Sequence, residues 1–148
     1  MVLYRYRHRS EETWDREGLR RIVARTNDDD KMLNFEGTRT AGLLHASANG
    51  QRVERAADLP TTSLWHPATP RASMLLDVED GGLVTIRPRA LGTRVLTTPL
   101  GDRRCQGHAL GDARNREVWY DPAGRLVRVD FSAPADGSAI RIELAQIG

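Results

Sequence analysis

The sequence predicts an all-β protein, built as a broad antiparallel meander sheet or an open half-barrel. Two observations carry this prediction. Apolar and polar residues alternate with a period of two through most of the chain, as they do in half-buried strands. Turn residues interrupt the alternation at short intervals, which is typical of strands joined by hairpins. With 148 residues, of which 39% are hydrophobic, the chain fits a single domain, residues 1–148, around one core.

The opening segment YRYRHRSEETW, residues 4–14, is the first predicted strand. Tyr4, Tyr6 and His8 share one face of an extended segment, and the intervening arginines share the other. We expect the rings to point inward and the guanidinium groups to face water. The same alternation argues against a nucleic-acid partner, because stacking rings and phosphate-binding arginines would lie on opposite sides of the sheet.

The remaining strands are predicted from the turn signals that separate them. Asn-Gly, Gly-Gly and Asp-Pro-Ala-Gly sequences favour turns, because glycine allows positive φ and Asx side chains bond to their own backbone. The segments expected to be strands are 19–27, 32–40, 43–48, 84–91, 94–100, 103–110, 116–121, 125–132 and 139–146. The last two alternate most clearly, so we expect them to form a hairpin with one face in the core and one in water.

Residues 56–80 interrupt the strand pattern. Three prolines punctuate this segment, which carries Trp65 and ends in a short apolar run before Gly81. Pro70 near a first turn and Gly81 as a stop predict one short helix near 70–79. We expect the sheet to curl around this long irregular excursion, which would act as a plug or a lid over the concave face.

Charge, cysteine content and motifs exclude several functions. The net charge of +2 is too small to create a general field for DNA. Cys105 is the only cysteine, so an intramolecular disulfide or a cysteine-based zinc site cannot form. The Asn27–Lys31 run lacks EF-hand spacing and is explained more simply as a turn. We expect no metal, because the four histidines show neither His-x-x-x-His nor His-x-His spacing. We also expect no cofactor and no integral membrane segment, since the sequence has neither a glycine-rich phosphate loop nor a run of ~18 apolar residues.

Four motifs are distinctive in combination: YRYRHRSEETW, ARTNDDDK, SLWHPAT and EVWYDPAGRLVRVDF. Together they resemble a family of uncharacterised bacterial proteins, a domain of unknown function typically exported to the cell envelope. The resemblance spans Tyr4 to about Leu144. It implies a strand plan similar to that of periplasmic lipoprotein carriers and a location in the periplasm or cell envelope, but no activity.

Two departures from the family pattern bear on this resemblance. His66 stands where the family usually has asparagine before Pro67, which suggests a changed or acquired site. The chain also begins where family members have already formed two strands and a signal peptide. The resemblance therefore implies that an N-terminal leader and hairpin are missing, although the chain itself carries no signal peptide. A sheet edge left unpaired in this way would favour a homodimer.

We expect the concave side of the sheet to bind a small apolar or amphipathic ligand, since aromatic walls with few polar groups are typical of such sites. The predicted ligand-binding residues are Tyr4, Tyr6, Phe35 and Trp65, with His8 on the same face. The function predicted first is therefore a binding module for a small or lipid-like molecule, associated with the envelope.

The alternative function is a small hydrolase or lyase that needs no cofactor. His8 or His66 would act as the general acid or base near neutral pH. A nearby carboxylate would orient the imidazole, and the candidates are Glu12, Asp28 and Asp77. Core and loop histidines are more often structural or solvated, so the sequence leaves open whether any reaction is catalysed.

Overall fold

The computed structural model describes residues 5–133 and 136–145. Within these ranges the chain forms twelve strands, arranged in three antiparallel sheets, and one short 3-10 turn. This arrangement confirms the predicted all-β class and the antiparallel strand plan. None of the three sheets closes into a barrel in the described part of the chain.

The chain divides into two compact units. Unit 1 comprises Met1–Ser63 and Met74–Val84, and unit 2 comprises Leu64–Ser73 and Thr85–Gly148. The proline-containing excursion predicted at 56–80 therefore contributes to both units. Its beginning and end belong to unit 1, and its middle belongs to unit 2.

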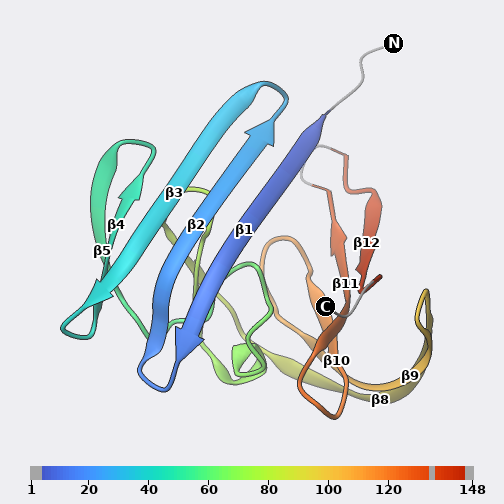
Figure 1. Ribbon diagram of the computed structural model, residues 1–148. Coiled ribbons are helices and arrows are strands. Elements are labelled where there is room, and N and C mark those ends of the chain that lie inside the picture. Colours follow the sequence, from blue (N-terminus) through green and yellow to red (C-terminus); the bar gives the residue numbers. More distant parts are fainter. Residues whose placement is uncertain (1–4, 134–135, 146–148) are drawn as a thin grey trace. The chain divides into compact units, whose positions relative to one another are not determined.

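Unit 1 contains a five-stranded meander in which each strand pairs with the next along the chain (Figure 1). Tight turns join these strands, and pairs such as Ala41-Gly42 and Asn49-Gly50 adopt the positive φ that two-residue hairpins require. The strands are β1 (Tyr6–Asp15), β2 (Gly18–Asp28), β3 (Lys31–Thr40), β4 (Leu43–Ala48) and β5 (Gln51–Ala56). The first four lie where the alternation predicts strands.

The fifth strand, β5, was not predicted from the sequence. Its residues are mostly polar and exposed, and Val53 is its one large apolar side chain. β5 forms because its backbone pairs with β4 across the Asn49-Gly50 turn, from Ala48 opposite Gln51 onward. The segment is extended because it pairs with an existing strand. It has no apolar face of its own that would predict a strand.

The core of unit 1 lies on one face of this sheet. Among its largest side chains are Ile22, Phe35 and Leu44, each 0% exposed. Leu76 and Val78, from the part of the chain that returns to unit 1, belong to the same apolar cluster. Full burial of a side chain of this size contributes roughly 1.5–3 kcal/mol to folding. The returning segment is therefore held to the sheet by apolar packing.

The short helix predicted near 70–79 is reduced to a single 3-10 turn at its start. Only a 3-10 turn, η1 (Thr69–Arg71), forms there, and it is followed by a short strand, β6 (Met74–Leu76), paired with β7 (Leu83–Thr85). Ala72 is already extended at the end of η1. Leu76 exchanges backbone hydrogen bonds with the residues around position 61, which a helix would not allow. Tertiary pairing thus overrides the local helix signals.

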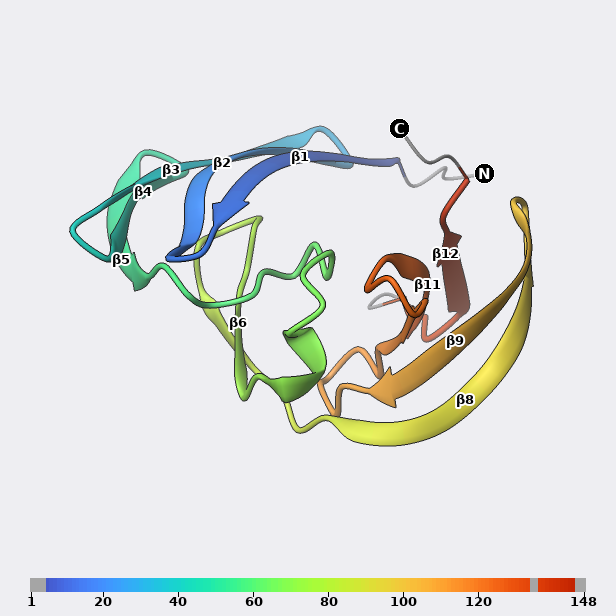
Figure 2. The same cartoon turned by 60° about the horizontal axis from the view of Figure 1, so that its bottom comes forward.

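Unit 2 contains the second five-stranded sheet, in the order β12-β11-β10-β9-β8. β8 and β9 form a long curved hairpin, in yellow and orange in Figure 2, with a register shift between Ala90 and Gly92. A bulge of this kind bends a strand and increases its twist. The strands are β8 (Arg89–Thr98), β9 (Gly101–Ala109), β10 (Glu117–Tyr120), β11 (Leu126–Ser132) and β12 (Ala139–Glu143).

The C-terminal hairpin forms as predicted, from β11 and β12. Its apolar face is buried only in part. Val127 and Val129 on β11 are buried, whereas Ile142 on the outer strand β12 is 56% exposed. An edge strand has a neighbour on one side only, which explains why the alternation predicts the strand but not its burial.

Trp119 is the largest side chain of an apolar cluster in unit 2. Trp119 is 2% exposed and clusters with Leu96, Cys105 and Val127. Its ring lies directly over Gly107, the paired residue on β9, where an added Cβ would come within 2.4 Å of it. One face of β9 therefore carries small, buried residues, Cys105 and Gly107.

Candidate functional site

The residues predicted to wall a concave face do not form a buried wall. Tyr4 lies outside the described residues. Tyr6 and His8 share a face of β1 as predicted, and their rings stack with centroids 6.5 Å apart, but Tyr6 is 47% exposed and His8 is also exposed. The Tyr6 hydroxyl donates a hydrogen bond to Glu79. Phe35 is fully buried in the core of unit 1, so its ring is out of reach of a ligand.

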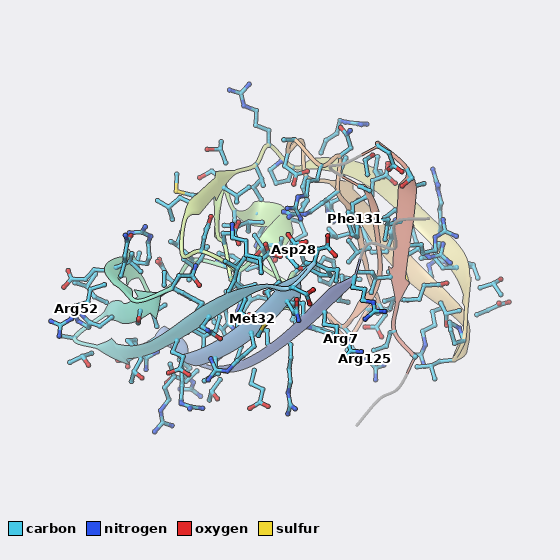
Figure 3. All side chains as sticks on the ribbon, turned by 90° about the horizontal axis from the view of Figure 1, so that it is seen from above. Arg7, Asp28, Met32, Arg52, Arg125 and Phe131 are labelled. Atoms are coloured by element: carbon cyan, nitrogen blue, oxygen red, sulfur yellow. The ribbon has the colours of Figure 1, made fainter. Side chains whose placement is uncertain are left out.

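His8 is held by a hydroxyl group of the neighbouring strand. Its Nδ1 atom lies 2.7 Å from Oγ1 of Thr26, the residue directly opposite it on β2. Thr26 is 1% exposed, so the contact ties the histidine to the sheet. Asp28, another predicted site residue, lies at the end of β2 opposite Tyr6 and is labelled in Figure 3.

Glu12 has a structural role that the sequence did not reveal. One carboxylate oxygen accepts a 2.7 Å hydrogen bond from the hydroxyl of Thr61, and the other accepts a 2.8 Å bond from the indole N–H of Trp14. The Thr61 hydroxyl also lies 2.5 Å from that of Ser63. Because Thr61 is 1% exposed, Glu12 fastens the start of the excursion to β1.

His66 forms the turn that leads into η1. Its Nδ1 accepts a hydrogen bond from the backbone N–H of Ala68, and its carbonyl oxygen accepts one from the hydroxyl of Thr69 at 2.6 Å. The adjacent Trp65 is 55% exposed. His66 belongs to unit 2, whereas His8 belongs to unit 1. Asp77, in unit 1, accepts a backbone hydrogen bond within its own turn.

Unit 2 contains a cavity of about 540 Å³, which we call the unit 2 pocket. Three parts of unit 2 border this open hollow: the middle of the excursion, the curved strands β8 and β9, and the end of β10 with the turn that follows. The lining residues are Pro67, Pro70, Arg71, Thr93, Arg104, Cys105, Gln106, His108, Tyr120, Asp121, Pro122 and Gly124. Among the described residues, the lining includes none of those predicted as site residues.

The alternation of β9 explains how this lining arises. Cys105 and Gly107 point toward Trp119, and Arg104, Gln106 and His108 therefore project from the opposite face. That face would be the wet side of an ordinary strand. Here the excursion lies over part of it, because these residues share the pocket with Pro67, Pro70 and Arg71.

Tyr120 connects the excursion to the sheet. Its hydroxyl donates a 2.6 Å hydrogen bond to the carbonyl oxygen of Leu64. Tyr120 is 6% exposed, and this burial raises the pKa of its phenol to about 12. Pro67 lies close to the turn that follows β10, since a Cβ added to Gly124 would lie 3.3 Å from it. These contacts fix one wall of the pocket.

Asp121 shapes the turn beside the pocket. Its Oδ1 atom accepts hydrogen bonds from the backbone N–H groups of Ala123 and Arg125, and its Oδ2 accepts one from the Arg125 guanidinium at 2.8 Å. Burial opposes ionisation of this carboxyl, but the bonds from Arg125 outweigh burial and lower its pKa. The Arg103 guanidinium also lies 3.8 Å from Oδ2 of Asp121. The Asp121 charge is therefore already neutralised.

The two arginines of the pocket are not neutralised in this way. Within the described part of the chain, neither Arg71 nor Arg104 makes a side-chain hydrogen bond or an ion pair. His108 adds no charge near pH 7, because burial lowers the pKa of its imidazole. Its Nδ1 atom is buried and has no partner among the described residues. The pocket is therefore positively charged.

Cys105 is a further lining residue, and its thiol is poorly placed for chemistry in the pocket. Cys105 is 1% exposed, and burial raises the pKa of its thiol, so the reactive thiolate is disfavoured.

The Asn27–Lys31 run forms a turn in unit 1, in which Oδ1 of Asn27 accepts a hydrogen bond from the backbone N–H of Asp30. Across the described residues, no cluster of three or more His, Cys, Asp or Glu side chains is placed to hold a metal ion.

The family model described as domain of unknown function DUF6134 matches residues 1–145. The chain belongs to this family. The resemblance to an uncharacterised domain family is thereby confirmed, and DUF6134 carries no described activity. No curated protein and no solved structure shows a significant match to the chain. In the described residues, no helix is long and apolar enough to cross a membrane.

Proposed function

We propose that this DUF6134 protein is a binding module for a small amphipathic molecule and that the unit 2 pocket is its binding site. The observation that carries the proposal is the cavity itself. Its volume of about 540 Å³ lies within the roughly 300–1,000 Å³ that small-molecule sites usually have. The site differs from the concave aromatic face that the sequence predicts.

The lining of the pocket supports binding by both apolar and polar contacts. Pro67, Pro70 and the ring of Tyr120 provide rigid apolar surface. Thr93 and Gln106 provide hydrogen-bonding groups on the opposite wall. Polar groups placed beside apolar surface fix the orientation of a ligand and give specificity.

Binding accounts for this lining better than catalysis does. The Tyr120 hydroxyl is committed to Leu64, the Asp121 carboxylate to its own turn, and the thiol of Cys105 is buried. A nucleophile next to a general base is the usual signature of covalent catalysis. Catalysis by His8 or His66 stays a prediction, and so do a lipid-like ligand, envelope association and homodimerisation.

A substitution that fills the pocket tests the proposal. Thr93 lines the pocket on β8, and Thr97 is an exposed threonine on the same strand outside the lining. Thr93→Trp should abolish saturable binding of the fluorescent probe N-phenylnaphthylamine, whereas Thr97→Trp should bind it like the original protein. Saturable binding that survives in Thr93→Trp, or no binding by the original protein, would contradict the proposal.

A further inference from the structure

The charge of the pocket lining carries an inference about the ligand. Arg71 reaches the pocket from η1 and Arg104 reaches it from β9, so the two cations come from separate walls. The one carboxylate in the lining, that of Asp121, is engaged by Arg125 and Arg103. The remaining charge of the lining is therefore positive.

Three other arginines of unit 2 form ion pairs with nearby carboxylates. Arg128 lies 2.9 Å from Glu143, Arg141 lies 2.7 Å from Asp130, and Arg116 lies 3.1 Å from Asp112. In the part of the chain that the structure describes, Arg71 and Arg104 have no such acidic partner. Their guanidinium groups keep all of their hydrogen-bond donors available to a ligand.

Guanidinium chemistry defines which ligand group fits. The planar fork of arginine binds carboxylate, sulfonate and phosphate groups through paired N–H bonds, and such charge-assisted bonds are roughly twice as strong as neutral ones. A hollow with low-dielectric walls also focuses the field of its charges toward an entering anion. The prolines and the Tyr120 ring remain available for an apolar portion of the same molecule.

We propose that the unit 2 pocket selects small amphipathic organic anions, with Arg71 and Arg104 binding the acidic group and the proline-rich wall holding the apolar portion. This inference rests on the proposed binding function and names the chemical class of its ligand. It concerns the acidic group alone and does not depend on whether that group is a carboxylate, a sulfonate or a phosphate.

Two probes with the same aromatic skeleton test the inference. N-phenylnaphthylamine is neutral, and anilinonaphthalene sulfonate carries one negative charge. The original protein should bind the sulfonate more tightly than the neutral probe. Added salt should weaken the binding of the sulfonate but not that of the neutral probe, because salt screens charge–charge attraction. Thr93→Trp should abolish both, which would place both probes in the pocket.

Charge-removing variants identify the residues responsible. Arg71→Gln and Arg104→Gln should each weaken sulfonate binding roughly tenfold, the scale of one charge-assisted hydrogen bond, and leave the neutral probe within about twofold. Arg89→Gln removes an exposed arginine of β8 outside the lining and should change neither probe. Far-ultraviolet circular dichroism confirms that each variant is folded.

The outcomes separate this inference from the function on which it rests. Suppose that the neutral probe binds saturably and that Thr93→Trp abolishes this binding. If the original protein then shows no preference for the sulfonate, or if the arginine variants keep that preference, the anion inference is overturned and the binding function stays intact. Failure of both probes to bind would overturn both proposals. Sulfonate binding that Arg89→Gln weakens as much as Arg104→Gln would show a general charge effect and overturn the assignment.

Discussion

The Tyr120 hydroxyl donates a 2.6 Å hydrogen bond to the carbonyl oxygen of Leu64. Both residues are buried, and Leu64 has a φ of 66°, a left-handed conformation that a leucine rarely adopts. The strained residue is therefore held at the point where the excursion meets the sheet of unit 2. This bond sets the position of the wall that carries Pro67, Pro70 and Arg71.

Removing this bond should destabilise unit 2. Tyr120→Phe leaves the Leu64 carbonyl buried without its donor, which we expect to lower the free energy of unfolding by about 1–3 kcal/mol. Tyr6→Phe is the matched control, because the Tyr6 hydroxyl bonds Glu79 at an exposed site and its loss should cost less than about 0.5 kcal/mol. Urea unfolding measures both changes. Equal effects of the two variants would contradict the role assigned to Tyr120.

Gly107 should tolerate no side chain. A Cβ at this position would lie 2.4 Å from the ring of Trp119, which is itself 2% exposed and cannot move into solvent. We expect Gly107→Ala to lower the unfolding free energy by about 1–3 kcal/mol or more through overpacking. Thermal or denaturant unfolding measures this loss.

A second substitution checks that the cause is the Trp119 ring. Trp119→Phe gives the added methyl group more room, so the Gly107→Ala/Trp119→Phe double variant should lose less stability than the sum of the two single variants. Strict additivity of the two losses would show that the two positions do not compete for the same space.

The sequence predicts one side of this arrangement but not the other. Segment 103–110 is identifiable as a strand from its alternation, and the small residues Cys105 and Gly107 mark its buried face, over which Trp119 packs. The alternation does not show that the polar face, with Arg104, Gln106 and His108, borders a pocket shared with Pro67 and Pro70. Packing between segments distant in sequence leaves no local signal, so the sequence does not predict the pocket.

The two errors in unit 1 and the excursion have the same origin. The helix signals near 70–79 are local, whereas β6 forms because the N–H of Leu76 bonds the carbonyl of Pro60. The expectation that the rings of β1 line a buried wall treats alternation as burial. Alternation establishes that Tyr6 and His8 share a face, and only the packing partners decide whether that face is covered.

His108 should make the protein less stable in acid. Burial lowers the pKa of its imidazole below the usual 6.5, so between 6.5 and the lower value the unfolded chain binds a proton that the folded protein does not. Stability is therefore fully present above pH 6.5 and falls as the pH decreases below it. Urea unfolding at pH 7.5 and 5.5 measures the loss.

Substituting the histidine tests its share of this pH dependence. His108→Gln should reduce the difference between the two pH values, because glutamine does not titrate. His45→Gln, at an exposed histidine of β4, should leave the contribution of His108 in place. An unchanged pH dependence in His108→Gln would contradict the assignment.

The Ala41-Gly42 turn is suboptimal and can be improved. Ala41 is exposed and has a φ of 51°, a conformation that costs alanine roughly 1–2 kcal/mol and asparagine or glycine less. We expect Ala41→Asn to raise the unfolding free energy by about 0.5–1 kcal/mol, since it creates the Asn-Gly pair already present at Asn49-Gly50. A thermal melt that shows no gain would contradict the turn geometry assigned here.

The most direct test of the account is a two-dimensional nitrogen–proton NMR titration of the labelled protein with anilinonaphthalene sulfonate. The account predicts saturable shifts concentrated on the backbone amides of Thr93, Gln106, Tyr120 and Arg71, and their loss in Thr93→Trp. Shifts concentrated instead on Tyr6 and His8, or shifts that do not saturate, would contradict the assignment of the unit 2 pocket as the binding site.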